Sequence, residues 1–320
     1  MSAPGRSQAR SAEGSPVSDD RKDRLDGLAV VLLLACCALW GINQVAMKVA
    51  LAQIPPLSQS ALRSAVAALL LGGWALARGI PLRQRDGTLR GGMLAGLLFA
   101  AEFGCMFVGL QYTTASRMVV FIYLAPFVVA LFMPLISRSE RLDLGQGLGL
   151  ALAFAGVVWA FAEGLAAARG SQQWLGDALG IVTAVLWGAT TLVLRGSRLA
   201  TATPEKTLLY QLAVSALALG AAALLSGESW PAQVDALAWG ALAFQTVVVT
   251  FASYLVWFWL IRHYPATRIS AFTLLTPVFG LLAGVALLGE PVSSRLLIAL
   301  AAVSCGIALV NRVGRRPIAA

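Results

Sequence analysis

Side chains that could carry out bond-making chemistry are few and scattered in this chain. Its one histidine is His263, and its four cysteines, Cys36, Cys37, Cys105 and Cys305, contain no C-x-x-C pair. Metal sites and nucleophile–base pairs need several such groups close together, and the G-x-x-x-x-G-K-[ST] loop of ATP-driven motors is also missing from the sequence. We therefore expect no metal, no cofactor and no enzymatic activity.

Glu102 is the clearest chemical candidate, because it is the only clear carboxylate deep inside a long apolar stretch. It stands 13 residues into the stretch 89–110, which is about 20 Å along a helix. A charge at the centre of a membrane helix costs roughly 2.5–3.5 kcal/mol. Three interpretations stay open: proton coupling, capture of a substrate ammonium group, or a protonated carboxyl group hydrogen-bonded to a neighbouring helix.

Other candidates are aromatic and small polar side chains, also deep in apolar stretches. They could line a solute path, or they could pack and hydrogen-bond between helices. The candidates for this lining are Trp40, Asn43, Gln44, Tyr123, Trp187, Thr190, Tyr254 and Trp257. Pro126 and Pro277 each remove a helix hydrogen bond, so we expect them to kink gating helices or to shape static ones.

The elements that position these residues are predicted from composition and apolar runs. The chain has 320 residues, of which 58% are hydrophobic and 12% charged, with a mean hydropathy of +0.78. Soluble domains are roughly 45–50% apolar and about 25% charged, so we expect an all-α membrane protein. Runs near the ~20 residues that span a bilayer as a helix predict ten transmembrane helices, at 27–50, 57–77, 89–110, 115–136, 143–162, 175–195, 205–225, 237–261, 267–288 and 293–311.

The basic residues predict an orientation rather than a nucleic-acid partner for the net charge of +9. With a cytoplasmic N-terminus, 19 of the 24 Lys and Arg residues fall on the cytoplasmic side, as the positive-inside rule requires. Both termini are then cytoplasmic, with a disordered tail at 1–26 and a short tail at 313–320. Lys48, Arg63 and Arg117 fall near outer span ends, where snorkelling to headgroups or a role in an outer gate explains them.

An internal repeat organises the ten spans. Leu39-Trp40-Gly41 recurs as Leu186-Trp187-Gly188, 147 residues later, and Phe121, Leu124 and Pro126 match Phe272, Leu275 and Pro277 at a spacing of 151. Two five-helix repeats, at 27–162 and 174–312, follow from these matches. Because each repeat holds an odd number of spans, the second enters from the opposite side. Such inverted repeats place a substrate site between the halves and give alternating access.

Ten helices in two five-helix repeats resemble the EamA family of the drug/metabolite transporter superfamily. The resemblance is carried by Leu39-Trp40-Gly41, Lys48, Arg63, Tyr112-Thr-Thr-Ala-Ser, Pro126, Glu140-Arg141, Trp187-Gly188, Pro277 and Gly289-Glu290. It implies a multi-pass protein of the bacterial inner membrane that exports small metabolites, including amino acids and aromatic ones among them. Glu102 lies outside the family pattern.

The resemblance leaves alternatives open. Carriage of other small solutes or efflux of cationic drugs is one, and a non-transporting receptor or scaffold is the less favoured other. The expected partners are a small-molecule substrate and membrane lipids, with no nucleic acid and with protons as the possible coupling ion. The sequence specifies no oligomeric state.

Overall fold

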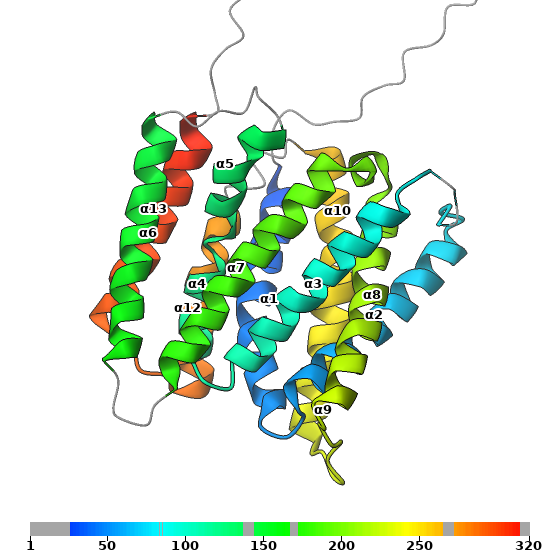
Figure 1. The fold of residues 1–320 in the computed structure, drawn as a ribbon, viewed down its shortest axis with the longest axis horizontal. Helices are drawn as coiled ribbons and strands as arrows, with labels where there is room; N and C mark the ends of the chain where they lie inside the picture. The colour runs from blue at the N-terminus through cyan, green and yellow to red at the C-terminus, as the bar shows by residue number, and fades with distance from the viewer. Residues whose placement is uncertain are drawn as a thin grey trace, which may run out of the picture.

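A computed structural model describes residues 26–82, 84, 86–136, 144–166, 172–264 and 272–313, and these ranges contain helices and no strand. The long helices alternate in direction, and the described chain begins and ends at the same end of the bundle (Figure 1). The α-helices are α1 (Gly27–Leu51), α2 (Pro56–Ala77), α3 (Leu89–Gly109), α4 (Ala115–Ile122), α5 (Ala125–Ile136), α6 (Leu144–Leu165), α7 (Gln173–Gly196), α8 (Pro204–Leu225), α9 (Ala236–Ala243), α10 (Tyr254–His263), α12 (Thr276–Leu288) and α13 (Ser294–Val313). The other helical elements are two 3-10 helices, η1 (Arg198–Thr201) and η3 (Thr273–Leu275), and a π-helix, η2 (Phe244–Ser253).

Several sequence predictions lie outside the described residues. These are the N-terminal tail up to residue 25, the C-terminal tail from 314, and the first residues of the span predicted at 267–288. Glu140, Arg141 and the other basic residues in the gaps also lie outside them.

Eight helical stretches in the described ranges are long and apolar enough to cross a membrane, and two shorter apolar helices, Thr276–Leu288 and Ser294–Leu309, accompany them. Their positions follow the predicted spans, because long apolar runs with polar ends define such helices directly. Polar caps fix several starts: the Asp26 carboxylate accepts from the Ala29 amide at 2.9 Å, and Asp235 caps α9 in the same way.

The stretch predicted as one helix at 115–136 is broken. α4 ends at Ile122, residues 123 and 124 form a turn, and α5 begins at Ala125. Pro126 is the second residue of α5, and Pro277 is the second residue of α12, directly after η3. A proline in the first turn of a helix gives up an N–H group that has no partner there in any case. The α-helix of each predicted span is thus interrupted directly before the proline, and a role of these interruptions in gating stays a prediction.

The stretch predicted at 237–261 is helical but changes its period. Residues 244–253 form the π-helix η2, in which the Thr250 hydroxyl donates to the Gln245 carbonyl at 2.8 Å, five residues back. A π-helix inside an α-helix is rare and frequently marks a functional site. The wider turns also mean that Thr250 and Tyr254 do not share a face by simple α-helical spacing.

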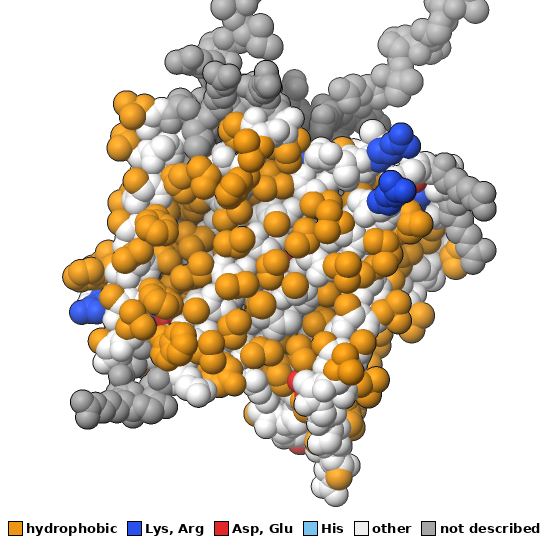
Figure 2. Space-filling model, in the orientation of Figure 1, with side chains coloured by type: hydrophobic (Ala, Val, Ile, Leu, Met, Phe, Trp, Pro, Cys, Tyr) orange, Lys and Arg blue, Asp and Glu red, His pale blue; other side chains and the backbone are white. Residues whose placement is uncertain are grey.

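Several polar side chains are buried inside this bundle, and many large apolar side chains are exposed on its outside. Leu148, Phe154 and Trp159 of α6 are 61%, 63% and 50% exposed, whereas Arg63, Glu102 and other polar residues are buried. Hydrophobic side chains cover most of the face in Figure 2, with Lys and Arg side chains at its margin. α6 and α13 lie side by side at one edge (Figure 1). The surface is suited to contact with lipid rather than water, as in a multi-pass membrane protein.

The repeated Leu-Trp-Gly sequence has a packing reason. A methyl group added at Gly41 would lie 2.8 Å from the Cβ atom of Phe279, and one added at Gly188 would lie 2.6 Å from the Cβ atom of Val128. Each glycine therefore lets its long helix, α1 or α7, approach the helix that follows a break, α12 or α5. Phe279 and Val128 are themselves 151 residues apart.

Candidate functional site

A cluster of aromatic rings joins α1 to α10. The Trp40 ring lies 5.0 Å from Trp257, edge to face, and 6.2 Å from Tyr254. The indole Nε1 of Trp40 donates to the Ser253 hydroxyl at 2.8 Å. Ser253 is the last residue of η2, so the end of the π-helix presents Ser253 and Tyr254 to α1.

A second aromatic pair lies beside the first. The Tyr123 ring, in the turn between α4 and α5, stands edge to face with Trp187 of α7 at 5.8 Å. Tyr123, Trp187 and Tyr254 all belong to one hydrophobic cluster of the core. The structure therefore brings together five of the predicted lining residues, Trp40, Tyr123, Trp187, Tyr254 and Trp257.

Arg63 of α2 and Glu102 of α3 are two further buried polar candidates. Phe103, the neighbour of Glu102 in the chain, and Tyr254 belong to the same hydrophobic cluster of the core. Arg63 is 2% exposed, and its guanidinium carbon stands 3.9 Å from the centre of the Phe103 ring. Arg63 thus points into the bundle, and the expectation that it snorkels to the headgroups is wrong.

Neither charged side chain has a hydrogen-bond partner at its buried atoms. The Arg63 atoms Nε and Nη2 have none, and neither has Glu102 Oε2. Buried polar atoms in proteins are nearly always paired. Unpaired atoms on both Arg63 and Glu102 therefore indicate that a polar solute can bind there. Sequence position alone missed Arg63; the Phe103 and Phe107 rings, next to Glu102 and one turn apart, were the signal for a stacked cation.

Asn43 and Gln44 are buried on α1 and are partly satisfied. Asn43 Nδ2 contacts the Met47 sulfur at 3.3 Å, and Gln44 Nε2 contacts the Met106 sulfur at 3.7 Å. The side-chain oxygens of both residues have no partner, which leaves them available to a solute or water. Gln44 reaches α3 one turn beyond Glu102.

Thr190 is placed differently from the other predicted lining residues. Its hydroxyl donates to the Leu186 carbonyl of its own helix at 2.9 Å, a bond typical of threonine within membrane helices. The described contacts of Thr190 do not join it to the aromatic group.

A second polar region closes the end of the bundle opposite the described chain ends. Arg117, only 4% exposed, donates to both carboxylate oxygens of the fully buried Asp177, at 3.1 Å from Nε and 2.6 Å from Nη2. A third bond, from Nη1 at 2.8 Å, reaches Glu163. Arg117 therefore does not snorkel either. Asp177 does not stand out in the sequence, because a carboxylate near the start of a helix is common.

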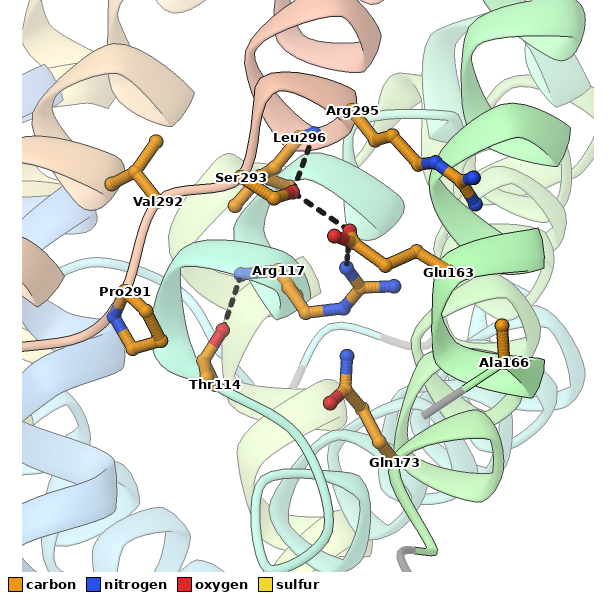
Figure 3. A pocket seen from close by; sticks show the side chains of 10 residues that line it. All are labelled: Thr114, Arg117, Glu163, Ala166, Gln173, Pro291, Val292, Ser293, Arg295 and Leu296. Atoms are coloured by element: carbon orange, nitrogen blue, oxygen red, sulfur yellow. Dashed lines mark hydrogen bonds and ion pairs between the residues drawn. The ribbon is translucent and has the colours of Figure 1, made fainter. Parts of the chain in front are cut away.

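A cavity of about 510 Å³ opens beside this ion-pair network. Figure 3 shows the Arg117 guanidinium and the Ser293 hydroxyl both directed at Glu163, while Arg295 extends away from them. The charged groups that line this cavity are mostly paired with one another. We therefore interpret the cavity as a vestibule, that is, an outer opening, rather than as the place where a solute binds.

Lys48 and Glu290 add a link from α1 to this end. Glu290 accepts hydrogen bonds from the backbone amides of Ala115 and Ser116, at 2.7 and 2.9 Å, and so caps α4. Lys48 donates to the Thr113 carbonyl and lies 3.9 Å from Glu290. Lys48 therefore links α1 to Thr113, just before α4, and to Glu290.

The buried groups described above differ from those of a metal site. The described ranges hold no group of three His, Cys, Asp or Glu side chains that could bind a metal. The aromatic group together with Arg63 and Glu102, called the central group below, has one basic side chain, one carboxyl group and several aromatic faces. Such groups are typical of solute recognition.

Comparison with known proteins agrees with this description. The profile of the EamA-like transporter family matches residues 27–162 and again 174–312. The chain is 29% identical to the uncharacterized transporter YvbV of Bacillus subtilis (strain 168) over 289 residues, covering 88% of this chain and 90% of that protein.

Two further likenesses concern function and fold. A protein of Salmonella typhimurium named as a probable amino-acid metabolite efflux pump is 27% identical over 306 residues, covering 92% of this chain and 96% of that protein. One crystal structure shares the fold, with a TM-score of 0.62 at 22% identity, covering 89% of this chain and 98% of the other. With its two profile matches spanning most of its length, the chain belongs to the EamA-like transporter family of the drug/metabolite transporter superfamily, whose members are transporters and not enzymes.

Proposed function

We propose that this protein is a secondary carrier that exports small metabolites, amino acids and aromatic ones among them, by alternating access. One observation carries the proposal: each aromatic contact of the central group joins residues 27–162 to residues 174–312. Trp40 contacts Tyr254 and Trp257, and Tyr123 contacts Trp187. Solute sites of carriers with inverted repeats lie at this kind of boundary.

The membrane arrangement of the proposal is ten spans in two inverted five-helix halves, 27–162 and 174–312, with both termini cytoplasmic in a bacterial inner membrane. The eight long and two shorter apolar helices support the number of spans. The paired use of Gly41 and Gly188 supports the repeat, and the distribution of Lys and Arg supports the orientation.

The substrate class of the proposal rests on two kinds of support. The relative named as a probable amino-acid metabolite efflux pump shares 27% identity along 92% of this chain. The central group also has aromatic faces beside polar atoms, which suits an amphiphilic small molecule. Protons are the proposed coupling ion, because the buried Oε2 of Glu102 has no partner and a carboxylate in that position can exchange a proton.

Efflux of cationic drugs is a second candidate function. The cluster of Trp40, Tyr254 and Trp257 favours it, since cations bind over aromatic faces. A receptor or scaffold has less support, because it has no use for buried polar groups without partners.

Counterflow in proteoliposomes tests the proposal. Purified protein is reconstituted in vesicles loaded with unlabelled solute, and labelled amino acids, sugars, monocarboxylates, monoamines and cationic dyes are offered outside. Accumulation of at least one amino acid above protein-free vesicles is the expected result. Movement of cationic dyes alone would favour the second candidate, and movement of no solute would refute transport.

A further inference from the structure

Two opposite charges are held inside the bundle without touching. The Arg63 side chain of α2 is 2% exposed and the Glu102 side chain of α3 is 5% exposed. Arg63 lies over the ring of Phe103, the neighbour of Glu102 in the chain, yet Arg63 and Glu102 form no ion pair, for which a nitrogen–oxygen distance within 4.0 Å is needed. The described ion pairs nearby instead join Lys48 to Glu290 and Arg117 to its two carboxylates.

The free atoms of both side chains belong to their binding edges. The Arg63 guanidinium carbon lies 3.9 Å from the centre of the Phe103 ring. This cation–π contact partly stabilises its charge but provides no partner for its N–H edge. Nε and Nη2 on that edge have no partner, and neither has Glu102 Oε2. An Arg side chain presents a planar fork that matches a carboxylate. A buried charge without a partner is strongly unfavourable, so this arrangement favours the binding of a charged solute.

The signs of the two charges restrict that guest. A solute with only a positive charge would pair with Glu102 but be repelled by Arg63. A solute with only a negative charge would pair with Arg63 but be repelled by Glu102. A solute with both an ammonium and a carboxylate group satisfies both partners at once. We propose that Arg63 binds the carboxylate and Glu102 the ammonium group of a zwitterionic solute, an amino acid, where α2 contacts α3. This inference rests on the proposed transport function and makes Arg63 a specificity-determining residue.

Tyr254 supports the assignment from the other half of the chain. It packs against the hydrophobic cluster that contains Phe103, and its ring lies beside those of Trp40 and Phe258. The charged ends of the solute would therefore lie at Arg63 and Glu102, with its side chain toward the aromatic rings. An uncharged or singly charged solute would leave at least one buried charge unmatched, which is how a polar site rejects analogues.

The test begins on the wild-type protein and needs no variant. The solute that moves best in the counterflow panel is compared with analogues that lack one group, for example L-phenylalanine with phenethylamine and 3-phenylpropionate. We expect a zwitterion to be the best solute and each analogue to move at least ten-fold more slowly. A singly charged or neutral best solute, or an amine analogue as good as its amino acid, would overturn the inference while transport stands. Movement of no solute would instead refute the proposed function.

Variants then assign the two groups. Arg63→Gln should weaken half-saturation by the amino acid by roughly 10- to 100-fold, as expected for loss of a charged hydrogen bond, and should reduce the preference over the amine. Glu102→Gln should reduce the preference over the carboxylic acid. Arg78→Gln is the matched control, because Arg78 directly follows the same helix and is exposed. Unchanged preferences in both folded variants would remove Arg63 and Glu102 from the site.

Discussion

The hydroxyl oxygens of Ser64 and Ser215 lie 3.1 Å apart, although the residues are 151 positions apart in the chain. This is the same spacing that relates Phe121 and Pro126 to Phe272 and Pro277. When two equivalent residues of a repeat contact each other, the approximate two-fold axis passes between them. The contact between α2 and α8 is therefore the natural centre of the proposed inverted halves.

A second pair of contacts follows the same relationship. Thr113 donates to Asp177 at 2.7 Å, and Tyr264 donates to Asp26 at 2.9 Å. Thr113 and Tyr264 are 151 residues apart, and so are Asp26 and Asp177. Each contact joins the start of one half to the loop before the fourth span of the other. The two contacts lie at opposite ends of the bundle, as an inverted arrangement requires.

The paired glycines give the first prediction. Gly41→Ala and Gly188→Ala should each destabilise the protein by about 1–3 kcal/mol, because the added methyl groups meet Phe279 and Val128 in a close-packed interior. Thermal unfolding in detergent measures this effect. Gly73→Ala is the control, since no atom lies within 4 Å of its added methyl group; it should be neutral or stabilising. Equal behaviour of all three variants would contradict the packing role.

Hydropathy was enough to place most helices, and the reasons for its failures are physical. An apolar run records how long a segment stays in lipid, so the bounds of α1, α2, α3 and α8 could be predicted closely. It does not record where backbone hydrogen bonds are interrupted. The exact break after Ile122 therefore escaped prediction, although Pro126 indicated an interruption in this span.

The candidate site was predictable in type more than in detail. Trp40 and Trp187 stood out because tryptophan is unusual near the middle of a span, and both lie in the central group. Arg63 and Asp177 did not stand out, because the distance of a charged residue from the end of a helix does not reveal which way its side chain points. Both point inward, where stacking on Phe103 and bonding to Arg117 stabilise them.

The aromatic group gives the second prediction. Trp187→Ala and Tyr254→Ala should each slow counterflow by about ten-fold, since aromatic contacts contribute roughly 0.5–1.5 kcal/mol beyond their buried area. Initial rates at equal amounts of reconstituted protein measure the change. Trp159→Ala is a matched control, because Trp159 of α6 is 50% exposed on the lipid side. Normal rates in both test variants would remove these residues from the solute path.

The third prediction concerns the buried pair of Arg117 and Asp177. Asp177→Asn should destabilise the protein by about 3–5 kcal/mol, because it leaves the Arg117 charge without its buried partner. Glu163→Gln should cost less, since the Glu163 side chain is 31% exposed and its pair is accessible to solvent. Denaturant unfolding compares the two. If Asp177→Asn is as stable as Glu163→Gln, the pair does not hold this end together.

Acid should weaken a contact at the other end of the bundle, which is the fourth prediction. Asp86 accepts from Lys206 Nζ and from the Thr88 hydroxyl, at 2.8 and 2.6 Å, and these bonds hold the pKa of its carboxyl group well below the ordinary value. A lowered pKa in the folded state stabilises the fold above about pH 4, and the effect is lost as the pH falls further.

Melting temperatures of wild type and Asp86→Asn should therefore differ by a constant amount from pH 8 to 5 and converge at lower pH. High salt should reduce the difference, since Asp86 is at the surface. A difference that grows on acidification would have the wrong sign for this contact.

Glu102 gives the fifth prediction, which links binding to coupling. If one carboxylate holds either a proton or the ammonium group of the solute, the two compete, and exchange of proton for solute follows from that competition. An imposed pH gradient should then accelerate wild-type transport several-fold, whereas Glu102→Gln should move solute at the same slow rate with or without the gradient. The ratio of the two rates is the informative quantity, because it is independent of how much folded protein each preparation contains. Glu163→Gln alters a carboxylate in the vestibule, 31% exposed and paired with Arg117, and should keep the wild-type ratio. A wild-type ratio in Glu102→Gln would show that the proton travels by another group.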